Sequence, residues 1–69
     1  MPLTLAGNNS SVKIRNIGGK QEVRHHLENL GICPGVNILV VKKVNFSLIV
    51  SVKGVRIALD EKTAKSIFI

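Results

Sequence analysis

In the second half of the chain the apolar residues recur with a period of two, which is the spacing typical of β-strands. Residues 38–44 are apolar on both faces, so we expect a strand that is covered on both sides or that runs through a small barrel with a cover outside. Leu48, Val50 and Val52 alternate with Ile49, Ser51 and Lys53, and Val55, Ile57 and Leu59 alternate with Arg56 and Ala58. The pattern therefore predicts a mainly β fold.

The two alternating runs predict a β-hairpin. A two-residue turn at Lys53-Gly54 would pair Val52 with Val55 and place both on the same face, so that the two strands share one core. Residues 45–47 are predicted to connect the first of these strands to the preceding one.

A helix is predicted over residues 20–30. Val23, Leu27 and Leu30 recur at i, i+4 and i+7, which gives one narrow apolar stripe. Gly31 follows as a left-handed cap, and Pro34-Gly35 then makes a turn. Before the helix, Gly18-Gly19 ends a strand predicted over residues 12–15.

The two ends of the chain carry shorter signals. Leu3 and Leu5 are expected to pack on the edge of the domain as a short lead-in. Near the other end, Asp60 is well placed as the N-cap of a helix over residues 61–66, with Ala64 and Ile67 on its buried side. Residues 67–69 are predicted to form the last strand.

Taken in order, these elements are a strand, a helix, a three-stranded meander, a short helix and a strand. Five short strands in 69 residues favour a small, partly open barrel over a doubly wound sheet. We expect one domain over residues 1–69, with its core over about residues 12–69. One helix lies between strands 1 and 2, and the other precedes the last strand.

The chain length also bears on function. A chain of 69 residues buries only about 60% of the surface that it exposes when unfolded, so a deep enzyme cleft is hard to build. We therefore expect that this protein is not an enzyme. Glu22, Glu28, Asp60 and Glu61 are explained by helix capping and solubility, which leaves no catalytic residues. Cys33 is the only cysteine, which favours a reducing, cytoplasmic compartment.

The formal net charge of +6 raises the alternative of a small basic barrel that binds nucleic acid. The basic residues that would form this surface lie where the chain has no acidic residue: Lys42, Lys43, Lys53 and Arg56. Phe46 and Phe68 are the only aromatic residues, so stacking platforms for bases are almost absent and nucleic acid is an unlikely partner. The charge suits an acidic partner or an anionic membrane surface.

A divalent transition metal is the one cofactor that the side chains suggest, with His26 and Cys33 as candidate ligands. His25 and His26 are adjacent on a helix and point about 100° apart, so they cannot share one ion. A closed zinc site needs four ligands, and no second cysteine is present. The favoured interpretation is a half-buried histidine and a small buried thiol, with no tightly bound cofactor.

Three segments together resemble the FeoA domain. They are Ile17-Gly18-Gly19, Arg24-x-x-Leu27-x-x-Leu30-Gly31-Ile32-x-Pro34-Gly35, and Gly54-x-Arg56-Ile57-Ala58-Leu59. The resemblance covers residues 12–69, and the second and third segments are moderately specific as a pair. It implies an SH3-like barrel with a helical insertion between the first two strands.

The resemblance also implies a stand-alone cytoplasmic accessory protein of bacterial ferrous iron uptake, which acts with the membrane transporter FeoB on its cytoplasmic side. We expect the contact surface on the helix and the turn after it, at Arg24, Leu30, Gly31, Ile32, Cys33, Pro34 and Gly35. A proline-glycine turn presents side chains on a rigid loop, which is a low-entropy anchor. The alternative for Ile32 is that it fills the mouth of the barrel.

Overall fold

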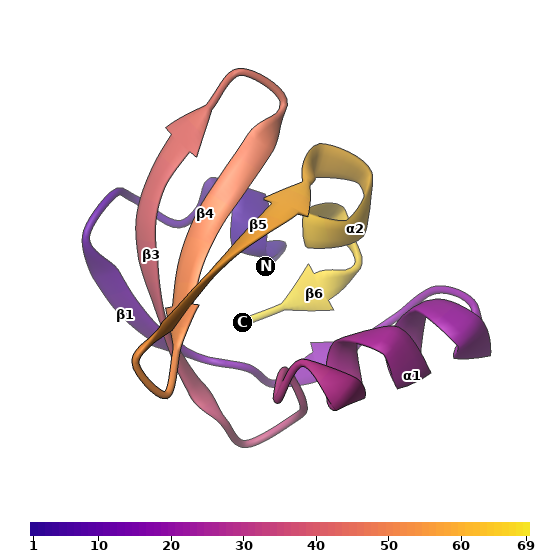
Figure 1. Cartoon of the computed structure of the whole chain (residues 1–69). Helices are drawn as coiled ribbons and strands as arrows, with labels where there is room; N and C mark the ends of the chain where they lie inside the picture. Colours follow the sequence, from indigo (N-terminus) through magenta and orange to yellow (C-terminus); the bar gives the residue numbers. More distant parts are fainter.

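A computed structural model describes residues 1–69 of the chain. The elements follow the order 3₁₀-helix η1 (Leu3–Leu5), β1 (Ser10–Lys13), β2 (Asn16–Ile17), α1 (Gln21–Asn29), β3 (Asn37–Val44), β4 (Ser47–Val52), β5 (Val55–Asp60), α2 (Glu61–Lys65) and β6 (Ile67–Phe68). Figure 1 shows the strands curled around a common interior, with α2 at one end and α1 projecting at the side. The mainly β class with two helices is confirmed.

The strands form two antiparallel sheets. One has the order β1-β3-β4-β5, and the other pairs β2 with β6. No strand of the larger sheet pairs with a strand of the smaller sheet, so the barrel is open. Both edge strands of the larger sheet, β1 and β5, are therefore left without a partner strand on one side.

The first predicted strand is divided in two, which raises the number of strands from five to six. The chain crosses from the larger sheet to the smaller one at Ile14 and Arg15. The backbone N–H of Ile14 donates to the Val36 carbonyl at 2.9 Å, whereas the N–H of Arg15 donates to the Phe68 carbonyl at 2.8 Å. The alternation of buried and exposed residues is interrupted at this crossing, because the exposed Arg15 and Asn16 lie between the buried Ile14 and Ile17.

The core is made of aliphatic side chains from every layer. Val40, Val50 and Ile67 are completely buried, and the other members come from β2 to β5, both helices and the segments around them. The buried residues are Leu3, Ile14, Ile17, Leu27, Ile32, Ile38, Val40, Leu48, Val50, Val52, Leu59, Ala64 and Ile67. No polar side chain lies among them, so the stability of the fold comes from apolar burial.

The outer face of β3 is not covered, contrary to the expectation for residues 38–44. Ile38 and Val40 point into the core, whereas Leu39 on the other face is 40% exposed. Helix α2 does not cover this face, because it packs against η1, β4, β5 and β6. The apolar residues on both faces of β3 therefore mark an uncovered sheet face instead of a strand between two layers.

The predicted hairpin is confirmed in its register. Val52 pairs with Val55, and the turn residues Lys53 and Gly54 have φ angles of 51° and 83°. Two left-handed residues in a two-residue loop define a type I′ turn, whose twist matches that of the strands. Val52 is buried, but Val55 is 61% exposed, because β5 is an edge strand and nothing covers its end.

The amino-terminal segment belongs to the core and not to the edge of the domain. Leu3 is completely buried, whereas Leu5 is 67% exposed. The segment is held by the other end of the chain: the Ile69 N–H donates to the Met1 carbonyl at 2.8 Å, and Pro2 bridges to Phe68. The expectation of an edge position was wrong for Leu3. The polar, turn-rich residues 7–11 that follow give no indication that the segment before them reaches the interior.

Helix α2 begins as the sequence predicts. The Asp60 carboxylate accepts a hydrogen bond from the backbone N–H of Thr63 at 3.1 Å, and Ala64 and Ile67 are completely buried. Hydrogen bonding from Thr63, through its side chain and then its backbone N–H, lowers the pKa of Asp60. A carboxylate at the start of a helix also faces the positive end of the helix dipole.

Candidate functional site

The end of α1 and the following residues form a closed hydrogen-bonded cap. The N–H of Gly31 donates to the Glu28 carbonyl and the N–H of Ile32 donates to the Leu27 carbonyl, each at 2.9 Å. Gly31 has a φ of 86°. This pair of bonds with a left-handed glycine is a Schellman motif, which ends a helix and fixes the direction of the outgoing chain.

The turn that follows is tied to the barrel by its backbone. The N–H of Gly35 donates to the Ile14 carbonyl at 2.8 Å, and the N–H of Val36 donates to the Cys33 carbonyl at 3.2 Å. Gly35 has a φ of 89° and open space around its α-carbon. The segment 30–35, which we call the cap turn, is therefore held at both ends by backbone bonds and is exposed at Leu30, Pro34 and Gly35.

Most side chains of α1 and several of the cap turn are exposed to solvent. Arg24, Pro34 and Gly35 are exposed, Leu30 is 36% exposed, and Cys33 is half-buried. Leu27 is the only fully buried residue of α1, and Val23 is half-buried. Of the apolar stripe expected from Val23, Leu27 and Leu30, only Leu27 is fully buried. Most of the surface of α1 is therefore available for contact with a partner.

Ile32 does not belong to this surface. Its side chain is completely buried in the main core cluster. The structure thus corrects its assignment as a contact residue and agrees with the alternative that it fills the mouth of the barrel. Its spacing from Leu30 in the sequence could not separate the two roles, because the chain leaves the helix at the left-handed Gly31 and the helical period no longer applies beyond it.

The two candidate metal ligands do not form a closed site. His26 is exposed on α1, which contradicts the expectation that it is half-buried, and Cys33 is half-buried beyond the end of the helix. No group of three or more His, Cys, Asp or Glu residues is arranged to hold a metal ion. Two residues supply at most two of the four ligands that a structural zinc site needs, so this set does not fit such a site.

The four basic residues of the second half do not share one surface. Lys42 pairs with Ile49 and Arg56 pairs with Ser51, which places both on the outer face of the larger sheet. Lys43 pairs with the buried Leu48 and so lies on the opposite face. Lys53 lies in the turn of the hairpin. A continuous basic track for a nucleic-acid backbone is therefore not formed by these side chains.

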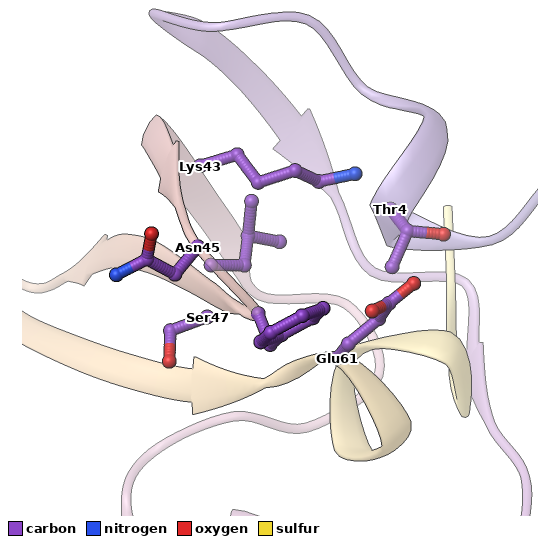
Figure 2. A pocket seen from close by; sticks show the side chains of 7 residues that line it. Thr4, Lys43, Asn45, Ser47 and Glu61 are labelled. Atoms are coloured by element: carbon purple, nitrogen blue, oxygen red, sulfur yellow. The ribbon is translucent and has the colours of Figure 1, made fainter.

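Two hollows were not expected from the sequence. Figure 2 shows the first, at the β3–β4 turn, where the Lys43 side chain reaches across toward Thr4 and Glu61. Its volume is about 10 Å³, which is room for a single water molecule. A cavity of this size holds no substrate.

The second hollow lies between the start of α1 and α2. It has a volume of about 400 Å³ and is lined by Gly19, Lys20, Val23, Lys62, Thr63 and Ser66. Two lysines and two hydroxyl groups face it, but all of these residues are exposed or only half-buried. The sequence gives no signal for this hollow, because its two sides lie about forty residues apart and meet only in the fold.

An open barrel of short antiparallel strands, with a helix inserted after β2 and a short helix before the last strand, defines a small SH3-like domain. The family model of the FeoA domain matches residues 1–69. The chain belongs to the FeoA domain family, and proteins with this domain are associated with ferrous iron transport. Among curated proteins the chain has no match.

Three solved structures show the likeness in detail. An iron uptake regulatory protein (FeoA) is 31% identical, with a TM-score of 0.88 over 97% of this chain and 91% of that one. A FeoA-like protein from Clostridium acetobutylicum is 25% identical, with a TM-score of 0.85 over 97% and 80%. FeoA from Stenotrophomonas maltophilia, complexed with zinc, is 23% identical, with a TM-score of 0.84 over 99% and 87%.

The third of these structures bears on fold class. The Stenotrophomonas maltophilia protein is described as a prokaryotic SH3 domain protein and as a candidate activating factor of bacterial ferrous iron transport. The SH3-like fold of the present chain agrees with that description. Neither α1 nor α2 is long and apolar enough to cross a membrane.

Proposed function

We propose that this protein is a cytoplasmic accessory protein of ferrous iron uptake that docks on the cytoplasmic side of a FeoB-like transporter and modulates iron transport. The observation that carries the proposal is the match to the FeoA domain over residues 1–69. We propose no reaction for this protein.

The docking surface in this proposal is the exposed part of α1 and the cap turn, without Ile32. Three features support it. The cap turn is anchored by backbone bonds to Ile14 and Leu27, so little order has to be gained on binding. Leu30 and Pro34 offer apolar contacts. Arg24 adds a charge that suits an acidic partner surface.

The net charge of +6 also fits this location. A basic protein is attracted to an acidic cytoplasmic domain and to the anionic inner face of a membrane, and both lie close together at a transporter. This attraction is long-ranged and raises the association rate, whereas the cap turn would supply the specific contact.

The test is a titration of the cytoplasmic domain of the transporter with the wild-type protein and with Leu30→Asp. We expect Leu30→Asp to weaken binding by about tenfold or more, which corresponds to about 1.4 kcal/mol. Leu39→Asp is the matched control, since Leu39 is 40% exposed and Leu30 is 36% exposed, but Leu39 lies on the outer face of β3. Circular dichroism verifies that both variants fold.

Two outcomes would contradict the proposal at different levels. If the wild-type protein does not bind the cytoplasmic domain at high micromolar concentration, the partner is wrong. If Leu39→Asp weakens binding as much as Leu30→Asp does, the partner is retained and the surface is wrong. Ile32→Asp is not a usable probe, because a charge at a completely buried position disrupts the core.

A divalent metal is a finer element of the proposal. His26 and Cys33 could each contribute one ligand to an ion that is completed by the transporter or by a second molecule. Isothermal titration of the isolated protein with Zn²⁺, comparing the wild type with His26→Ala, tests direct binding. Because the isolated chain lacks three gathered ligands, we expect only weak binding in the absence of the partner.

A further inference from the structure

We propose that β5 pairs with β5 of a second copy of this chain, in an antiparallel register centred on Ala58, and joins the two larger sheets into one. This inference concerns a different surface from the docking of α1 and the cap turn, and it does not depend on the proposed function. It rests on which backbone groups β5 leaves free and on the charges that its outer face carries.

The register of the hairpin determines which backbone groups of β5 are free. A two-residue type I′ turn makes Val52 and Val55 a hydrogen-bonded pair, and such pairs alternate along an antiparallel ladder. Val55, Ile57 and Leu59 therefore bond to β4. Arg56 and Ala58 point their N–H and C=O groups away from β4, and no other backbone group bonds to them.

This free edge is accessible. β5 lies at the rim of the larger sheet, with no strand paired on its outer side (Figure 1). Arg56, Ala58 and Asp60 are exposed, and Val55 is 61% exposed. Free edges of this kind pair readily with another strand, and β5 has neither a proline nor a bulge that would prevent it.

The side chains of the free edge are complementary to themselves. In the register centred on Ala58, Ala58 lies opposite Ala58 of the second copy, and Arg56 lies opposite Asp60 of the second copy, twice by symmetry. Arg56, Ala58 and Asp60 all project from the outer face, so each opposed pair meets on one face. The small alanine at the centre leaves room for the twofold axis.

Other registers of the same two edges are less favourable. A register centred on Arg56 would place two guanidinium groups opposite each other, and like charges in that position destabilise a sheet. A register centred on Ile57 would pair Arg56 with Ala58 and leave both charges unmatched. Asp60 also serves as the cap of α2, but a carboxylate has about four acceptor positions, which allows both roles.

The other edge of the larger sheet lacks this pattern. Ile14 bonds to Val36, so by the same alternation Val12 bonds to β3 while Ser11 and Lys13 point outward. Serine and lysine offer no carboxylate to balance the charge of Lys13 in a second copy. The difference between the two edges makes β1 a natural control.

The experiment is sedimentation equilibrium of the full chain up to near-millimolar concentration. Pairing over five residues is small beside a standard interface of about 1,600 Å², so we expect weak, reversible dimers. We expect Ala58→Pro to abolish the dimer, because it removes a free donor without touching a bond to β4. Ser11→Pro makes the same change on the other edge and should leave the dimer intact.

Two further measurements test the register and do not depend on whether Ala58→Pro folds. Arg56→Glu should weaken the dimer by about tenfold or more, since two pairs change from attraction to repulsion. Hydrogen exchange should show the Arg56 and Ala58 amides of the wild type becoming protected as concentration rises, while those of Ser11 and Lys13 stay unprotected.

Several results would overturn the inference. One is a wild-type chain that stays monomeric at near-millimolar concentration. Another is a dimer in which the Arg56 and Ala58 amides exchange as fast as in the monomer, which would place the contact elsewhere. Equal loss of the dimer in Ser11→Pro and Ala58→Pro would also contradict it.

Discussion

The backbone N–H of Ile32 donates to the carbonyl of Leu27 at 2.9 Å, and the side chains of both residues are completely buried. This hydrogen bond connects the last turn of α1 to the segment leading into β3, and both side chains belong to the same core cluster. A Schellman motif is commonly accompanied by an apolar contact across the glycine. We expect the position of α1 on the barrel to depend on this pair, because Leu27 is the only fully buried residue of the helix.

Leu27→Ala is expected to lower the free energy of unfolding by about 2–5 kcal/mol, because it removes the only fully buried side chain of α1 and leaves a cavity. Leu30→Ala, at a position that is 36% exposed, should lower it by about 1 kcal/mol or less. Urea unfolding of both variants tests the difference. Equal effects would mean that the helix packs through another part of its surface.

Gly31→Ala is expected to destabilise the protein by about 1–2 kcal/mol through the backbone alone. The φ of Gly31 is 86°, which an alanine adopts only with strain, whereas the added Cβ would meet Val52 Cγ1 at an ordinary 3.6 Å. Gly7→Ala is the control, since Gly7 has no positive φ and open surroundings apart from Ser10 Oγ at 3.4 Å. Thermal unfolding that ranks Gly7→Ala as equally harmful would disprove this explanation.

The stability of the protein should decrease in acid partly because of Asp60. Its pKa is lowered in the folded state by hydrogen bonding from Thr63. A lowered folded-state pKa gives stability that is fully present above the usual value of 3.8 and is lost as the pH falls through the lower folded value.

Asp60→Asn separates this titration from the capping role, because asparagine is also a good N-cap but does not titrate. We expect the variant to keep α2 and to show a shallower loss of stability below the usual aspartate pKa of 3.8. The measurement is the free energy of unfolding by urea as a function of pH. Parallel curves for the wild type and the variant would exclude Asp60 as a source of the slope.

Lys53→Asn is expected to stabilise the hairpin by about 0.5–1 kcal/mol. Lys53 has a φ of 51° at the first position of the type I′ turn, where asparagine followed by glycine is preferred. Lys53→Ala should bring no such gain, since alanine tolerates the left-handed region no better than lysine. A melting temperature that does not rise in Lys53→Asn would show that the turn geometry differs in solution.

Much of the fold could be predicted because local signals agreed with one another. The stripe around Leu27, the glycine at position 31 and the hairpin pairing of Val52 with Val55 each specify their element without reference to distant residues. The division of the first strand at Ile14 could not be predicted. It depends on the arrival of Val36 and Phe68, which lie far along the chain.

The backbone course of the cap turn was predictable, but the burial of its side chains was not. The cap turn follows from its glycines and proline, yet the sequence cannot tell which of its apolar residues faces inward, and Ile32 proved to be in the core. For the same reason the exposure of His26 and of Leu39 was missed. Burial is set by which face of an element meets the core, and on short elements the period leaves that face undecided.

The crossing at Ile14 and Arg15 has a consequence for how the molecule opens. Consecutive amides donate to carbonyls at Val36 and Phe68, so separating either sheet breaks bonds on the same short stretch of backbone. We therefore expect the two sheets to open together. The Ile14 and Arg15 amides should therefore exchange with solvent only through global unfolding, as expected for a domain that behaves as a single cooperative unit.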